Sequence, residues 1–158
     1  MMEPYFLLKW AHVLSSTVLF GFGAGTAWYF WNAHLSGDAG TIAKVGRMVV
    51  RADWIFTGGS GILQPISGVL LARVAGYSLT ESWLVAAYAL YALAFACWAP
   101  VVWLQIRATE LAEQAAELGS PLGLDYRRVI RWWFALGWPA FAGLTATFWL
   151  MIARPQLW

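Results

Sequence analysis

Four long apolar stretches divide the chain, and polar turn-forming residues separate them. Helices are predicted at about residues 5–31, 42–74, 83–118 and 126–153. Each contains the roughly 20 mostly apolar residues that a helix needs to cross a bilayer. The intervening segments 32–41, 76–78 and 119–123 are rich in Gly, Ser, Asn and Asp, which is typical of turns. The pattern therefore predicts an all-α polytopic membrane protein, an antiparallel four-helix transmembrane bundle forming a single domain over residues 1–158.

The second and third predicted helices extend beyond their apolar parts, and we expect these extensions in the cytoplasm. Residues 42–51 place Lys44, Arg47 and Arg51 on one stripe and apolar residues on another, which indicates an amphipathic helix. The third helix continues past Trp103 to about residue 118 through strong helix formers. Both helices are thus longer than the membrane requires.

These two extensions should lie side by side, because a short turn joins their helices at the opposite end. The register predicts three ion pairs: Arg51 with Glu110, Arg47 with Glu113, and Lys44 with Glu117. Exposed pairs are worth about 0–1 kcal/mol each, so they would set register more than stability. The alternative is that the basic stripe binds anionic lipid.

The distribution of basic residues predicts the orientation. Seven Lys or Arg residues lie on the side that holds the two extensions, and three lie on the side that holds the chain ends. Loops with more basic residues stay in the cytoplasm. We therefore expect a bacterial inner-membrane protein with both termini in the periplasm.

Composition supports the membrane class. The chain is 61% hydrophobic and 11% charged, where a soluble domain would be about a quarter charged. The 12 tryptophans suit the headgroup zone, and membrane lipid is an expected partner. A net charge of +2 gives no indication of nucleic-acid binding. The single cysteine, Cys97, excludes a disulfide framework and is expected to be a small core residue.

Small residues and a proline mark two packing features. Thr17, Gly21 and Gly25 repeat every four residues, so they share one helix face and allow another helix to approach closely. This face is a candidate for self-association. Pro65 lacks an N–H and therefore frees the carbonyl of Gly61 from its usual helical partner, which favours a kink.

His12 is the candidate for chemistry, because an ionisable side chain inside a membrane helix is costly. A neutral histidine can ligate haem iron or copper, relay protons, or hydrogen-bond a neighbouring helix. All three roles stay open. His34 lies 22 residues later, about 33 Å along a continuous helix, so the two histidines cannot share one metal site.

Partners for His12 must come from other helices at the same depth. Tyr88 and Gln64 are candidate binding residues, and Met151 is a candidate thioether ligand. Interhelical hydrogen bonding by Gln64 and simple packing by Met151 are the alternatives. The acidic residues are all expected at or beyond the membrane interfaces, and the chain shows no nucleophile–base pair, phosphate loop or zinc motif. A hydrolase site is therefore not expected.

Several motifs carry a resemblance that spans nearly the whole chain. They are LKWAHVL, ADW at residues 52–54, QP at residues 64–65, CWAPVVWLQIR at residues 97–107, GWPAF, and FWLMIARP. Together they resemble an uncharacterised family of bacterial predicted integral membrane proteins, domain of unknown function 2269. That resemblance implies a membrane protein and brings no activity with it.

The opening K-x-x-H motif is also distantly similar to the first helix of the J-type protoporphyrinogen oxidases and the D-type copper-resistance membrane proteins. In the oxidases that histidine is implicated in binding haem b, and His12 and Lys9 match the motif. Those enzymes also use a lysine on a later helix. This chain has no lysine after Lys44.

Two functional hypotheses follow. In the first, the protein is redox-associated and binds haem b, a related porphyrin or a quinone near the outer leaflet, with His12 as metal ligand or proton acceptor and Tyr88, Gln64 and Met151 around it. In the second, it is a non-catalytic accessory or permeation protein for a metal ion or small solute. A third possibility is that His12 only ties helices together.

Overall fold

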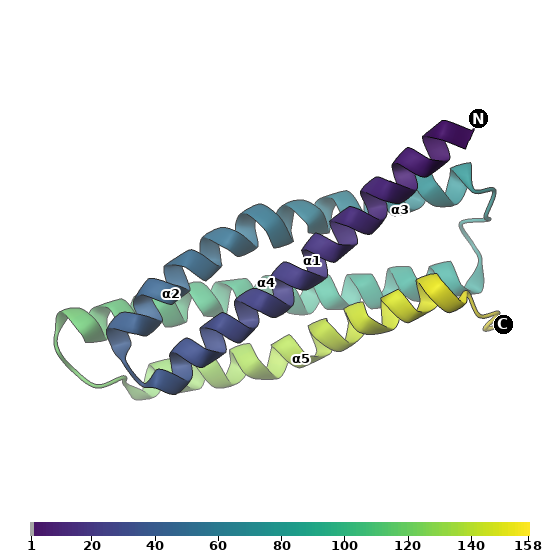
Figure 1. The fold of residues 1–158 in the computed structure, drawn as a ribbon. Coiled ribbons are helices and arrows are strands. Elements are labelled where there is room, and N and C mark those ends of the chain that lie inside the picture. The colour runs from purple at the N-terminus through teal and green to yellow at the C-terminus, as the bar shows by residue number, and fades with distance from the viewer. Residues whose placement is uncertain (1) are drawn as a thin grey trace.

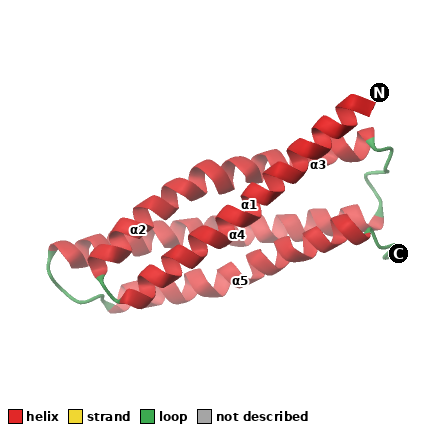
Figure 2. Ribbon diagram, in the orientation of Figure 1, coloured by secondary structure: helices red, strands yellow, loops and turns green. Residues whose placement is uncertain are grey.

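The computed structural model describes residues 2–158, and every regular element among them is helical (Figure 2). The elements are α1 (Met2–Ser36), α2 (Ala39–Ala52), η1 (Asp53–Gly58), α3 (Gly59–Val74), α4 (Ser82–Glu117) and α5 (Leu124–Ala153). Because α2, η1 and α3 follow one another without a break, they form one long helical segment. Within residues 2–158, four helical segments are therefore long and apolar enough to cross a membrane.

The connections lie at two ends of the molecule. The short loop after α1 and the loop between α4 and α5 lie at one end, and both termini lie with the α3 to α4 connection at the other (Figure 1). The all-helical architecture agrees with a four-helix membrane protein. Large apolar side chains such as Trp10, Ile62 and Trp103 lie 63–66% exposed on the outside, as expected for residues that face lipid.

The first loop is much shorter than residues 32–41, because polar residues at the end of α1 stay helical. The side-chain amide of Asn32 donates to the carbonyl of Trp28 at 2.8 Å, within the helix. Gly37 then takes a positive φ of 69°, which reverses the chain. Asp38 caps α2 at once by accepting from the backbone N–H of Thr41 at 2.7 Å.

Element η1 is a π-helix, a wider turn that is frequently found at functional sites. It buries Asp53 and Thr57 while Trp54, Ile55 and Phe56 remain exposed. The polar residues of η1 therefore face protein and its large apolar residues face outward, which is the arrangement expected inside a membrane.

The packed core lies at the end of the bundle opposite the termini. Its fully buried members come from all four helical segments and include Phe30, Ile42, Ala108 and Tyr126. Small residues let helices approach closely: a side chain at Gly46 would occupy the space of the Thr109 side chain, and one at Gly143 would lie 3.2 Å from the carbonyl of Leu90. The α2–α4 and α4–α5 contacts thus depend on glycine.

The predicted glycine face of α1 is not used for packing within the chain. A side chain at Gly21 or Gly25 would meet no atom within 4 Å, and Thr17 is exposed. The close approach to α1 occurs instead at Gly68, where an added Cβ would lie 3.1 Å from the Cε1 atom of His12. Self-association through Thr17, Gly21 and Gly25 stays a prediction.

The middle pair of the predicted ion-pair ladder is confirmed. Arg47 bonds Glu113 across the α2–α4 contact. The prediction for Glu110 is wrong, because Arg107, one turn earlier on the same helix, takes that carboxylate at 2.9 Å. Among residues 2–158, Lys44 makes no ion pair within 4 Å. Residues three apart on a helix are neighbours on its surface, so Arg107 reaches Glu110 within α4.

Candidate functional site

His12 lies between α1 and α3 in a small polar cluster. Its Nδ1 atom is 2.9 Å from the hydroxyl of Ser67, and its Nε2 atom is 3.4 Å from the amide nitrogen of Gln64. The hydroxyl of Ser15 donates to the amide oxygen of Gln64. These four side chains therefore join α1 to α3 by hydrogen bonds in the terminal half of the bundle.

Both ring nitrogens of His12 are engaged. When the Ser67 hydroxyl donates to the carbonyl of Leu63, 2.8 Å away, Nδ1 carries the ring proton and Nε2 accepts from Gln64. The ring edge rests against Gly68. A haem or copper ion would have to displace one of these contacts, so the residues around His12 do not fit an axial ligand site in this conformation. Within residues 2–158, no group of three or more His, Cys, Asp or Glu side chains is placed to hold a metal ion.

The structure brings together two of the four predicted binding residues, His12 and Gln64. Tyr88 is 38% exposed on α4. Met151 packs in a separate apolar cluster with Ala72, Trp83 and Leu84. The four side chains therefore do not surround one common site.

A second polar cluster, which we call the Asp53 network, lies farther from the chain termini than the His12 cluster does. The Oδ1 atom of Asp53 accepts from the hydroxyls of Thr26 at 2.8 Å and Thr57 at 3.0 Å, and Oδ2 accepts from the amide of Gln105 at 2.8 Å. Asp53 is only 6% exposed. Asp53 therefore lies inside the bundle, where three donors from α1, η1 and α4 compensate its burial. That every acidic residue lies at or beyond a membrane interface stays a prediction.

The indole of Trp133 on α5 completes the Asp53 network. Its N–H donates to the Oε1 atom of Gln105 at 3.0 Å. All four helical segments therefore contribute to one hydrogen-bonded network. Sequence reasoning missed this network, although two of the motifs quoted above, ADW and CWAPVVWLQIR, contain Asp53 and Gln105. Gln105, like Gln64, is an amide in an otherwise apolar run, and this pattern could have marked it as a buried hydrogen-bonding residue.

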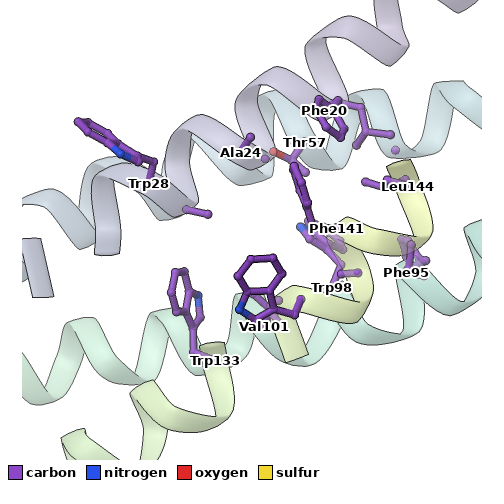
Figure 3. Close-up of a pocket in the computed structure, with 18 of the residues that line it drawn as sticks. Phe20, Ala24, Trp28, Thr57, Phe95, Trp98, Val101, Trp133, Phe141 and Leu144 are labelled. Atoms are coloured by element: carbon purple, nitrogen blue, oxygen red, sulfur yellow. The ribbon is translucent and has the colours of Figure 1, made fainter. Parts of the chain in front are cut away.

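A cavity of about 400 Å³ lies beside the Asp53 network, between α1 on one side and α4 and α5 on the other (Figure 3). Small residues such as Gly23, Ala24 and Gly137 leave the space open. About half of the residues that line it are aromatic, including Phe20, Trp28, Trp98, Trp133 and Phe141. Its volume falls within the range of about 300–1,000 Å³ seen for small-molecule sites.

Two hydroxyl-bearing residues, Thr57 and Tyr91, also line this cavity. The Tyr91 hydroxyl donates to the carbonyl of Gly61, which is the carbonyl that Pro65 was predicted to free. Tyr91 therefore satisfies a backbone group that the helix cannot, and this holds its ring in the wall. The expected freed carbonyl is confirmed, with a partner that the sequence did not identify.

The cavity and the His12 cluster are separate. Leu19, the first cavity residue on α1, follows His12 by seven residues, about 10 Å along the helix. His12 does not line the cavity. Thr57 and Trp133, in contrast, belong both to the cavity wall and to the Asp53 network. The Asp53 network thus borders the cavity, whereas the His12 cluster does not.

Comparisons with known proteins agree with the membrane architecture. The family described as predicted integral membrane protein (DUF2269) matches residues 6–155, nearly the whole chain. No curated protein matches the chain, and no solved structure does. The matched range includes the His12 cluster, the Asp53 network and the cavity.

Proposed function

The chain belongs to the DUF2269 family of integral membrane proteins, and we propose that it binds a small apolar ring compound of the quinone and quinol class within the bilayer. The observation that carries this proposal is the aromatic cavity beside the Asp53 network. Flat aromatic side chains favour stacking with a ring, at ring-centre separations of about 4.5–7 Å. A ligand of this class reaches the site by diffusing through the lipid.

The polar side of the cavity supports a ligand with an oxygen-bearing ring rather than a plain hydrocarbon. Thr57 and Tyr91 provide hydroxyl oxygens in an otherwise apolar wall. Small-molecule sites commonly combine an apolar lining with a few placed polar groups that orient the ligand. Quinones and their reduced quinol forms have this pattern, with polar oxygens on an apolar ring.

In this proposal the His12 cluster ties α1 to α3 and does not touch the ligand. The hydrogen bonds to Ser67 and Gln64 support this role. Binding through His12 near the outer leaflet, with Tyr88, Gln64 and Met151 around it, would need a rearrangement that brings those side chains together. The hypothesis of binding through His12 then rests on the distant likeness to protoporphyrinogen oxidases and copper-resistance proteins.

We also propose a topology: an antiparallel bundle in a bacterial inner membrane with both termini in the periplasm. The excess of basic residues at the α2 and α5 ends supports this orientation. The α2 segment and the end of α4 then extend into the cytoplasm, where Arg47 and Glu113 pair.

Binding can be measured with 2-methyl-1,4-naphthoquinone added to the full chain in lipid nanodiscs. Five tryptophans line the cavity, so saturable quenching of tryptophan fluorescence is expected. Gly23→Leu places a side chain into the cavity and should weaken binding at least tenfold. Gly21→Leu is the matched control, because Gly21 lies on the same helix outside the lining and also has open space around it.

Equal binding by the wild type and Gly23→Leu would contradict the cavity as the site. Quenching that rises linearly without saturation, as for a compound that only partitions into lipid, would contradict the function. His12→Ala should lower thermal stability and leave the quinone affinity unchanged. A loss of quinone affinity in His12→Ala would indicate that the ligand binds at the His12 cluster.

A further inference from the structure

The two hydroxyl groups in the cavity wall already use their hydrogen atoms inside the protein. Thr57 donates to Oδ1 of Asp53 at 3.0 Å, and Tyr91 donates to the carbonyl of Gly61. A hydroxyl has one hydrogen and two acceptor lone pairs. Both oxygens can therefore only accept from a group in the cavity.

The hydrogen bonds of the Asp53 network keep the Thr57 hydroxyl hydrogen directed at Oδ1 of Asp53. An indole N–H donates and never accepts, so Trp133 requires the oxygen of the Gln105 amide to face it. The NH₂ group of Gln105 then faces Oδ2 of Asp53, which must accept. Oδ1 is left to Thr26 and Thr57.

These hydrogen-bond directions, which we call the polarity of the Asp53 network, are the same whether Asp53 is ionised or protonated. A proton on the carboxyl group finds an acceptor only from Oδ1, because the partner of Oδ2 is the NH₂ group of Gln105, which cannot accept. Thr26 can accept that proton, since its own hydrogen has a second acceptor in the carbonyl of Phe22 at 2.7 Å. Thr57 continues to donate to Oδ1 in both states.

We infer that the cavity selects a ring compound that carries a hydroxyl group, a phenol or quinol, over its carbonyl or ether counterpart. The inference rests on the proposed ring-binding function and adds the ligand's hydrogen-bonding class. The ligand hydroxyl donates to the Thr57 oxygen. The Tyr91 oxygen is a second acceptor, bonded to Gly61, which follows Thr57 by four residues, or about one helical turn. A carbonyl or ether oxygen placed there would face lone pairs and lose its hydrogen bond to water without replacement.

The test uses ring compounds of similar size that are stable to oxidation. The full chain in nanodiscs is titrated with 2-naphthol, 2-methoxynaphthalene and naphthalene, and each affinity is corrected for partition into lipid. The wild type should bind 2-naphthol about 3- to 10-fold more tightly than either of the other two compounds, the value of one net hydrogen bond. The two comparison compounds bracket 2-naphthol in size, so the preference cannot come from fit alone.

Substitutions at Thr57 and Asp53 test the assigned polarity. Thr57→Val should abolish the preference, and Thr57→Ser should retain it. In Asp53→Asn the side-chain oxygen still faces Gln105, so the new NH₂ group donates to the Thr57 oxygen and releases the Thr57 hydrogen toward the cavity. The preference should then fall and 2-methoxynaphthalene should bind more tightly than to the wild type, a change that loss of stability alone would not produce.

The outcomes separate the two proposals. If all three compounds bind equally well and Gly23→Leu removes them all, the ring site stands and the inference is wrong. If the preference persists in Thr57→Val, or Asp53→Asn leaves it unchanged, the assigned polarity is wrong. If none of the compounds binds saturably, both proposals fail. Should Thr57→Val not fold, the comparison of Asp53→Asn with Thr57→Ser decides the question.

Discussion

The indole nitrogen of Trp133 lies 3.0 Å from the Oε1 atom of Gln105, and this contact orients the whole Asp53 network. Because Trp133 can only donate, Gln105 presents its NH₂ group to Asp53, 2.8 Å away. One indole on α5 thus determines how a carboxyl group on η1 is hydrogen-bonded, although the two residues are 80 positions apart in the chain.

Trp133→Phe should lower the free energy of unfolding by about 1–3 kcal/mol, the cost of leaving a buried polar group unsatisfied. The smaller phenyl ring also gives up some buried apolar contacts, which lowers stability in the same direction. Thermal unfolding in detergent measures the effect. Trp132→Phe is the control, because Trp132 is next to Trp133 in the chain and is 59% exposed. Equal stability of the two variants would show that the Gln105 amide does not need this donor.

Tyr91→Phe should destabilise the protein by about 1–2 kcal/mol, because it removes the partner of the Gly61 carbonyl that Pro65 frees. Tyr88→Phe, three residues earlier on the same helix and 38% exposed, should have little effect. Thermal unfolding of both variants gives the comparison. The double variant Tyr91→Phe with Pro65→Ala should recover part of the loss, since an alanine N–H can bond the carbonyl again; no recovery would refute the pairing.

Gly46→Ala should destabilise the contact between α2 and α4, because its methyl group would overlap the Thr109 side chain. Overpacking of this kind typically costs about 1–3 kcal/mol. Gly59→Ala is the matched control: Gly59 has a helical φ of −60° and open space around it, so alanine should be neutral or stabilising. Chemical denaturation resolves the two. A neutral Gly46→Ala would mean that these helices can separate without loss.

The Arg47–Glu113 pair should contribute about 0–1 kcal/mol, since the Arg47 side chain is 52% exposed and the Glu113 side chain is 34% exposed. A double-mutant cycle with alanine at each position measures the coupling, and the coupling should shrink as salt is raised. The same cycle on Lys44 and Glu117 should give no coupling. A larger coupling for Lys44 and Glu117 than for Arg47 and Glu113 would indicate a different register.

The cap of α2 should weaken in acid. Hydrogen bonds from the side chain and the backbone N–H of Thr41 hold the pKa of Asp38 below its ordinary value of about 3.9. A carboxyl group with a lowered pKa in the folded state contributes stability above its unfolded pKa and loses it as pH falls through the folded value. Asp38→Asn keeps a good cap that does not titrate.

Thermal unfolding of the wild type and Asp38→Asn should therefore differ in pH dependence. The wild type should lose more stability than the variant as pH falls below about 4. Parallel curves for the two proteins over this range would exclude a role for the Asp38 charge.

The sequence by itself determined the number and approximate extent of the membrane helices, because apolar length and turn residues are local properties. It also determined that Pro65 would free the Gly61 carbonyl, since proline lacks the N–H needed one turn later. The Arg47–Glu113 pair was predictable because α2 is amphipathic and its polar stripe shows which way it faces. Each of these features depends on residues close together in the chain or on one clear helix face.

Only the tertiary structure decided what lies inside the bundle. Helices such as α1 are apolar on every side, so the sequence pattern contains no signal for their rotation about their own axes. That rotation brings Thr26, Asp53, Gln105 and Trp133 together and leaves Tyr88 at the surface. It also opens the cavity away from His12. Long-range packing sets these rotations, and so the sequence alone did not show that Asp53 is buried.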